Sequence, residues 1–466
     1  MEVVSHVSNA TVRITPNEVH IRDPEWAPVL YAGLGHIRDK DPSLAHSAGT
    51  ADGTFGTISH HIHRRRRAPA GVMSEVLRGH HERGTVVNAR STFLGWSNDT
   101  LGICSFGESQ DLLHDMGKVT ALIEVFKFFA AAFPILRQCG WLIPSALALP
   151  VTSIRYISKP IATLLDTHLV SVIWVFPLWF CLKCTDHGCI RYVPEYNPTR
   201  RTPHKGVQSD TSIFPEPSPV KKDHGKAGKQ ETLFDAILAS NLPETEKRPE
   251  RMAHEGFEIL LAGSDTAART MGVAIYHIVA NLKIKHRLQR ELRTAIPGPY
   301  DHIELRVLEQ LPFLNVVLKE SLRIGKITDH RLGLIAPTEA LQYKEWTLPP
   351  GVKTRISMTP DRNAFDEKFF LDPDSFLPDR WLQSDEQQLA AMNRVFMPFT
   401  HGRRGCLGMH FATIELQAGL ACLFRQFDFE LYDTIRERDV DHTWSHAAGE
   451  PSKGSKGLRF RVTAAY

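Results

Sequence analysis

The sequence predicts a mainly α-helical fold with a minor β-sheet, on three observations. Apolar residues recur at helical spacing over several long stretches, most clearly from Glu231 onwards. The alternation typical of strands is confined to short segments. No repeat of fixed period is visible, which excludes solenoids and propellers.

Composition narrows the class of protein further. Of the 466 residues, 42% are hydrophobic and 23% charged, which excludes wholesale disorder, collagen and coiled coil. Lys and Arg number 55 against 52 Asp and Glu, so the net charge does not indicate nucleic-acid binding. Seven cysteines in a chain of this length do not form a secreted disulfide scaffold. These features favour a reduced, intracellular protein.

The first third of the chain shows neither a signal peptide nor an anchor. Residues 1–18 lack both a basic region and an apolar run. Residues 11–32 predict a short strand followed by a helix that starts at proline, and residues 74–136 predict mainly helix. The longest apolar run, residues 169–182, is too short to span a bilayer comfortably and contains Pro177.

Residues 166–229 predict an atypical insertion or loop, because the apolar run gives way to a segment rich in Pro, Lys, Ser and Thr. Four soft ligands, Cys181, Cys184, His187 and Cys189, suggest zinc, but their spacing matches no rationalised site. A second explanation is that residues 169–204 are foreign sequence, such as a translated intron. The sequence leaves both open.

The C-terminal half has clearer periodicity. Residues 248–281 predict one long buried helix, and residues 282–295 predict a basic amphipathic surface helix. Residues 307–324 predict a helix interrupted by a Leu-Pro-Phe turn. Residues 340–358 predict two strands separated by a Pro-Pro-Gly turn.

A glycine-rich loop from Phe399 to Gly408 places Cys406 just before a predicted helix. The N–H groups at a helix N-terminus favour an anion, so the cysteine is well placed to act as a thiolate ligand. Glycines on both sides allow the backbone to approach whatever the sulfur binds. Taken alone, the loop is also consistent with a buried structural cysteine.

Two further motifs carry charges on predicted helices. In Ala-Gly-Ser-Asp265-Thr266, an acid beside an alcohol, at a turn that glycine loosens, suggests a proton relay into a buried cavity. In Glu320-Ser-Leu-Arg323, the i,i+3 spacing puts both charges on one helix face, where Arg380 can complete a buried triad. Each motif alone is common.

The three motifs, which follow one another along the chain and end with the cysteine loop, together resemble the cytochrome P450 family of haem-thiolate monooxygenases. Phe399-x-x-Gly-x-Arg404-x-Cys406-x-Gly matches the family's haem-binding signature at every fixed position. The resemblance covers about residues 11–165 and 230–462, and implies a single P450-like domain over residues 1–466. Relatives on membranes begin with an anchor, and this chain is expected to start near the family's first sheet. The sequence leaves open whether a first segment is missing or the protein is soluble.

The resemblance assigns roles to individual residues. Cys406 would be the axial ligand of the iron of haem b, with Phe399 beside it, and Asp265 and Thr266 would deliver protons to bound oxygen. The cations for the haem propionates would be Arg404, Arg67, His63 and Arg331. Glu320, Arg323 and Arg380 would be architectural.

The basic run of residues 64–67 has other interpretations. It fits a nuclear-localisation or nucleic-acid patch, or a solvated helix face. The near-zero net charge and the position of the run in the family's haem-edge helix favour contacts with propionates and a redox partner. We therefore expect no nucleic-acid partner.

The implied function is insertion of one atom of O2 into an apolar small molecule, with electrons from NADPH through NADPH–cytochrome P450 reductase. The runs after Thr232 and before the C-terminus resemble fungal secondary-metabolism members that act on terpenoids or polyketides. Such members sit on the endoplasmic reticulum membrane, so membrane contact is compatible with this chain although no transmembrane segment is evident. Two alternatives are a haem-binding remnant without turnover and a haem-thiolate isomerase or dehydratase.

Overall fold

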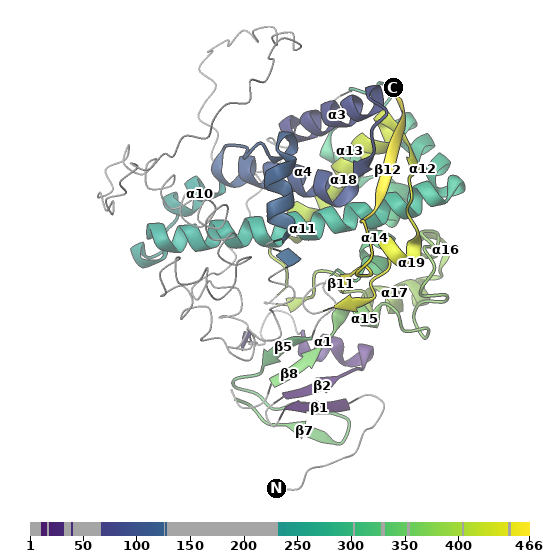
Figure 1. Ribbon diagram of the computed structural model, residues 1–466. Helices are drawn as coiled ribbons and strands as arrows, with labels where there is room; N and C mark the ends of the chain where they lie inside the picture. Colours follow the sequence, from purple (N-terminus) through teal and green to yellow (C-terminus); the bar gives the residue numbers. More distant parts are fainter. Residues whose placement is uncertain are drawn as a thin grey trace.

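The computed structural model describes residues 11–15, 18–31, 39–40, 67–124, 126–127, 232–301, 303–327, 331–351, 355–402, 405–445 and 449–466. These residues form a large body of helices with a small sheet region at one end (Figure 1). The predicted fold class, mainly α with a minor β-sheet, is confirmed. The predicted insertion of residues 166–229, with its cysteines, lies outside the described residues.

One long helix, α11 (Pro249–Ala280), runs through the centre of the helical body (Figure 1). It starts with proline at its first position, where a missing N–H costs nothing. Its core face is fully buried at Met271, Ala274 and Ile275. Asn281 ends this helix and caps the next one, since its side chain accepts the N–H groups at the start of α12. The bounds match the predicted helix of residues 248–281.

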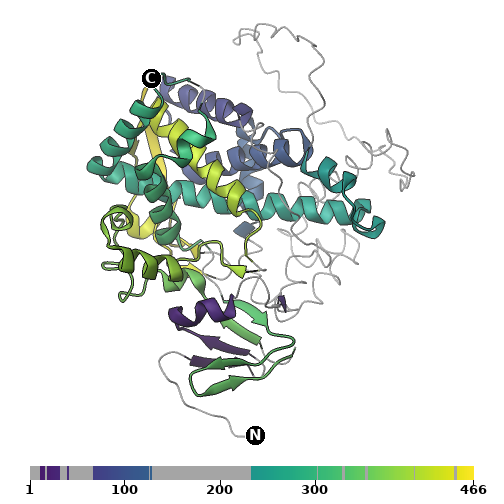
Figure 2. The ribbon, with the colours of Figure 1, turned by 180° about the vertical axis from the view of Figure 1, so that it is seen from behind.

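Further helices, both long and short, complete the helical body. They are α3 (Arg67–Glu82), α4 (Ala89–Phe106), α10 (Leu233–Ala239), α12 (Leu282–Ala295), α13 (Leu305–Glu309), α14 (Pro312–Gly325), α17 (Glu386–Val395) and α18 (Met409–Gln426). The predicted interruption near Pro312 is the break between α13 and α14. Helix α18 packs against α11, which Figure 2 shows from behind. None of the described helices combines the length and apolar character needed to cross a membrane.

The sheet region holds five strands in the order β1 (Thr11–Thr15), β2 (Glu18–Ile21), β8 (Arg355–Met358), β5 (Leu332–Ile335) and β3 (Asp39–Lys40). Two antiparallel strands, β1 and β2, therefore stand where the sequence predicted a single strand before the helix that starts at proline. A 3₁₀ turn, η1 (Pro24–Trp26), and the short helix α1 (Ala27–Leu30) follow. A second apolar core, including Leu30, Ile356 and Met358, lies under this sheet.

Residues 340–358 also contain one strand more than predicted. The strands β6 (Leu341–Tyr343) and β7 (Trp346–Leu348) pair with each other, and the Pro-Pro-Gly turn then leads into β8. Near the C-terminus, β4 (Val87–Asn88), β12 (Arg459–Ala465) and β9 (Phe427–Leu431) form a three-stranded sheet. A hairpin of β10 (Trp444–Ser445) and β11 (Gly449–Glu450) precedes β12.

Candidate active site

Cys406 lies in the connection between α17 and α18. The backbone reverses before it, with left-handed φ angles of 55° at Thr400 and 72° at Gly402. Two hydrogen bonds close the loop, from Cys406 N–H to the Phe399 carbonyl at 2.8 Å and from Gly405 N–H to the Gly402 carbonyl at 3.1 Å. The loop thus fixes Cys406 directly before the first turn of α18, as the motif predicted.

The environment of Cys406 differs from that of the other cysteines among the described residues. Cys406 is exposed, whereas Cys104 and Cys422 are buried. Helix α18 behind it is held rigidly by fully buried Leu420 and Phe424. The helix N-terminus favours the thiolate over the thiol. A buried structural cysteine, the alternative interpretation of this loop, does not describe Cys406.

Helix α11 has a short open stripe along its otherwise buried middle. Ala262 and Thr266, one helical turn apart, are exposed, while the intervening Ser264 and Asp265 are buried. The Thr266 hydroxyl donates to the Ala262 carbonyl at 2.8 Å, which holds its oxygen against the helix. Helix α11 runs unbroken here. Gly263 serves close packing, since a Cβ there would lie 2.6 Å from a methyl group of Leu101.

The N-terminal part of α18 shares an apolar cluster with this part of α11. Phe411, just after the cysteine loop, belongs to the same cluster as Leu260, just before the open stripe. Leu101 and Phe106 of α4 complete this contact. Packing therefore fixes the cysteine loop and the open stripe of α11 to one framework.

Asp265 is buried beside two arginines. Arg269 Nε donates to its carboxylate at 2.6 Å, and Arg90 Nε donates at 3.0 Å. Burial alone would raise the pKa of Asp265, but the guanidinium groups of Arg269 and Arg90 outweigh burial and hold that pKa below its usual range. The carboxyl group is therefore ionised. The i,i+4 spacing could have identified Arg269 as a partner, whereas nothing local in the sequence points to Arg90.

Glu320, Arg323 and Arg380 lie together, with Trp381 as a fourth member; we refer to these four residues as the Glu320 cluster. Arg323 donates two bonds to the Glu320 carboxylate, at 2.8 and 2.9 Å, and Arg380 donates one at 3.2 Å. The Trp381 indole donates another at 2.8 Å. Sequence reasoning missed this indole, although it directly follows Arg380.

Burial changes the energetic weight of this cluster. Exposed i,i+3 ion pairs contribute little to stability. The side chains of Glu320 and Arg323, however, are fully buried, and Arg323 also donates to the carbonyls of Ala364, Pro373 and Ser375. Removing one partner would leave an uncompensated buried charge, at a cost of about 3–5 kcal/mol. The cluster fastens α14 to the segment that leads into Arg380.

Of the four cations expected at the propionates, Arg331 alone has a described side chain. His63 and Arg404 lie outside the described residues, and only the backbone of Arg67 is described, at the start of α3. Arg331 is one-third exposed and pairs with buried Glu18 at 3.0 Å. Glu18 also accepts from the Ser357 hydroxyl at 3.0 Å. Arg331 thus lies directly before β5 and pairs with a buried carboxylate of β2.

Known proteins resemble the chain over most of its length. A family model described as Cytochrome P450 matches residues 218–456. Cytochrome P450 monooxygenase oblB of Emericella variicolor is 32% identical, over 96% of this chain and 80% of that protein. Tryptophan 6-hydroxylase fscE of Fusarium equiseti is 30% identical, over 97% and 84%. A crystal structure of a cytochrome P450 (CYP102L1), 14% identical, shares the fold with a TM-score of 0.65, over 95% of this chain and 89% of that one.

The helical fold and the exposed cysteine loop, with these matches, define a haem-thiolate class of oxidoreductase. The chain belongs to the cytochrome P450 family and is a monooxygenase related to fungal secondary-metabolism enzymes. The described residues fit the family's haem at two points: the exposed thiol of Cys406, and the open stripe of α11 at Ala262 and Thr266.

Proposed function

We propose that this protein inserts one oxygen atom from O2 into an apolar terpenoid or polyketide, with electrons from NADPH through NADPH–cytochrome P450 reductase. One observation carries the proposal. The exposed thiol of Cys406 stands at the start of α18, in the apolar framework that also holds the open stripe of α11. When bound, a thiolate-ligated haem supplies the O–O bond cleavage that such a reaction needs.

The residues of the chain would bind the haem, deliver protons and stabilise the fold. Cys406 Sγ would hold the haem iron, and Phe399 would flank the loop. Arg404, Arg67, His63 and Arg331 would hold the propionates, because buried carboxylates need cationic partners. Thr266 would position a proton at its hydroxyl, and Asp265 would be the acid behind it. Glu320, Arg323 and Arg380 would hold the fold.

The names of two relatives give information on the substrates of those relatives. One is a tryptophan 6-hydroxylase, and another, 27% identical over 97% of this chain and 86% of that protein, is Conidiogenone synthase PchP450 of Penicillium rubens. The small apolar side chain of Ala262 beside Thr266 supports a hydrocarbon substrate, since it offers no hydrogen-bonding group. Partnership with the reductase would bring the protein to the endoplasmic reticulum membrane.

The test is turnover in a reconstituted system of this protein, a fungal reductase, NADPH and ¹⁸O2. The substrates are a panel of terpenoid and polyketide hydrocarbons, with tryptophan as the comparison. We expect a product that carries one ¹⁸O atom and requires NADPH. Turnover without NADPH or O2 would instead establish an isomerase or dehydratase, and tryptophan oxidation alone would overturn the substrate class.

A further inference from the structure

Four buried charges meet where α4, α11 and the β10–β11 hairpin come together. Arg90 lies at the start of α4, Asp265 and Arg269 lie on α11, and Glu450 ends β11. We refer to these four residues as the Asp265 cluster. Asp265 and Glu450 are buried, and the side chains of Arg90 and Arg269 are exposed by only 19% and 7%.

Each arginine of the Asp265 cluster binds both carboxylates. Arg90 bonds Asp265 through Nε at 3.0 Å and Glu450 through Nη1 at 3.1 Å. Arg269 bonds Asp265 through Nε at 2.6 Å and pairs with Glu450 through Nη2. Two positive and two negative charges therefore balance. These are the charged groups that face Asp265 from its own helix, from α4 and from the hairpin among the described residues.

The sharing of both arginines by two carboxylates bears on the proposed role of Asp265 in proton delivery. A carboxylate that delivers protons must take one up, and doing so removes its negative charge. If Asp265 were the sole counter-ion, each uptake would leave two buried guanidinium groups uncompensated, which is strongly unfavourable. Glu450 already contacts both guanidinium groups, so one negative charge remains while Asp265 is neutral.

We propose that Glu450 is a positioning residue for Asp265, because it keeps Arg90 and Arg269 compensated while Asp265 carries a proton. This inference rests on the proposed role of Asp265 in proton delivery. Glu450 is brought to Asp265 by the β10–β11 hairpin, and no motif in the sequence indicates that this hairpin lies next to α11.

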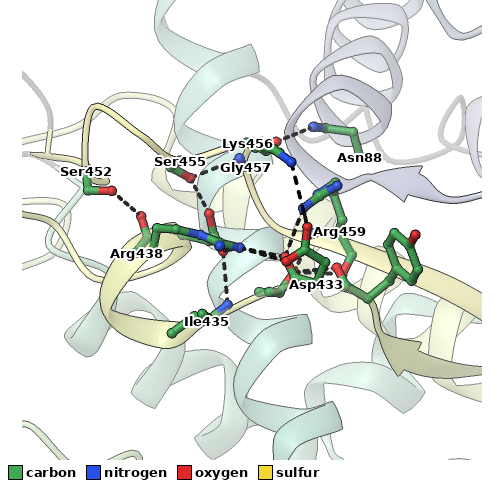
Figure 3. A network of polar contacts seen from close by, with 12 residues as sticks. Asn88, Asp433, Ile435, Arg438, Ser452, Ser455, Lys456, Gly457 and Arg459 are labelled. Carbon is green, nitrogen blue, oxygen red and sulfur yellow. Dashed lines mark hydrogen bonds and ion pairs between the residues drawn. The ribbon is translucent and has the colours of Figure 1, made fainter.

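The hairpin holds Glu450 in place independently of Asp265. Thr443 N–H donates to the Glu450 carbonyl at 3.0 Å, and Arg269 donates to the Gly449 carbonyl. A second polar network, shown in Figure 3, joins the chain before the hairpin to the chain after it. Ser452 donates to the Arg438 carbonyl at 3.0 Å, and Arg459 of β12 pairs with Asp433. In the same region, Asp439 accepts from Arg438 at 2.9 Å and from Ser455 at 2.6 Å. Glu450 can therefore hold the arginines while Asp265 changes its protonation state.

The first test is a double-mutant cycle on the full-length protein, with thermal unfolding midpoints for Asp265→Asn, Glu450→Gln and the double variant. Either carboxylate can serve both arginines, so we expect small falls for the single variants and a fall for the double variant that clearly exceeds their sum. Glu430→Gln, an exposed acid on strand β9, is the control and should not move the midpoint. Additive shifts would overturn the proposal.

The second test separates positioning from plain structural support. In haem-loaded Glu450→Gln, quantified by its carbon monoxide band, we expect product formed per NADPH consumed to fall several-fold, and Glu450→Asp to restore it. Unchanged coupling in Glu450→Gln would contradict the proposal. If the unsubstituted protein shows no thiolate-type band, the proposed function fails instead, and the unfolding cycle is still decisive for the charge-sharing arrangement.

Discussion

The Glu320 cluster and the Asp265 cluster are both buried sets of ion pairs, but they differ in their ratio of acids to bases. In the Glu320 cluster, one carboxylate receives two arginines, an indole and the backbone N–H of Leu377. In the Asp265 cluster, two carboxylates share two arginines. If its carboxylate were neutralised, the Glu320 cluster would keep no negative charge. The Asp265 cluster would still keep one, on its second carboxylate.

Because of this difference, the Glu320 cluster can only stabilise the fold, whereas Asp265 can change its protonation state. Glu320 cannot take a proton or move without leaving Arg323 and Arg380 uncompensated, so the cluster fixes the segment around α14. Asp265 has Glu450 as a substitute and stands next to Thr266 on the open stripe of α11. We expect substitutions in the Glu320 cluster to affect stability, and substitutions in the Asp265 cluster to affect activity.

The largest expected effect is that of Glu320→Gln. Loss of the only carboxylate should lower the free energy of unfolding by about 3–5 kcal/mol, because two buried guanidinium groups lose their counter-ion. Urea unfolding followed by circular dichroism measures it. Glu309→Gln, an exposed acid on α13, is the control and should change stability by less than about 0.5 kcal/mol. Equal effects of the two variants would show that the Glu320 cluster contributes no more to stability than an exposed acid.

Asp265→Asn should show the opposite pattern. We expect product formation to fall by roughly 100-fold, the usual scale for loss of a proton-transferring group. Unfolding stability should fall less than in Glu320→Gln, since Glu450 still compensates the arginines. Rates are normalised to the carbon monoxide band. A variant that turns over normally would show that Asp265 has no part in proton delivery.

The pH dependence of stability sharpens the comparison through His277, which lies on α11 near Arg323. Its ring stacks on Phe376 at 4.6 Å, and burial, with the charges of Arg436 and Arg323, lowers the pKa of His277 to about 3. The unfolded chain titrates at 6.5, so it binds more protons than the folded protein between pH 6.5 and 3. Stability is therefore fully present above pH 6.5 and is lost as the pH falls.

From pH 7.5 to pH 5 this one group should remove about 2 kcal/mol of stability. His277→Phe keeps the ring stack and should abolish that part of the loss, whereas His286→Phe, on the exposed side of α12, should leave it. Urea unfolding of each variant at both pH values measures the difference. Identical pH dependence in all three proteins would refute the assignment.

The smallest expected effect is that of Gly263→Ala, which tests the packing of α11 beside the Asp265 cluster. A new methyl group would meet the terminal methyl of Leu101 at 2.6 Å, so overpacking should offset the gain of about 1 kcal/mol that replacing Gly by Ala otherwise brings within a helix, with no net stabilisation. Gly454→Ala, with no atom within 4 Å of its new Cβ, is the control. In a Leu101→Ala background the clash is absent, so adding Gly263→Ala should no longer carry the cost of overpacking. An unchanged cost in that background would contradict the packing explanation.

The local sequence pattern predicted the long helices well, because α11 and α12 carry periodic apolar faces, Pro249 starts α11, and the Asn281 side chain caps α12. It counted one strand too few at residues 11–32 and again at residues 340–358, because the turns there are short and the pairing depends on distant strands. The cysteine loop and the Glu320 pair were also predicted, since their partners are close in sequence. Arg90 and Glu450 were not, because the fold brings them to Asp265 across 175 and 185 positions of the chain.

The central claim is that Cys406 is the thiolate ligand of a haem, and the most direct measurement is the absorption spectrum of the reduced, carbon monoxide-bound protein. We predict a strongly red-shifted Soret band that is lost in Cys406→Ser and kept in Cys422→Ser, since Cys422 is a buried cysteine within helix α18. A band typical of a neutral ligand in the unsubstituted protein, or a red-shifted band that survives in Cys406→Ser, would contradict the account.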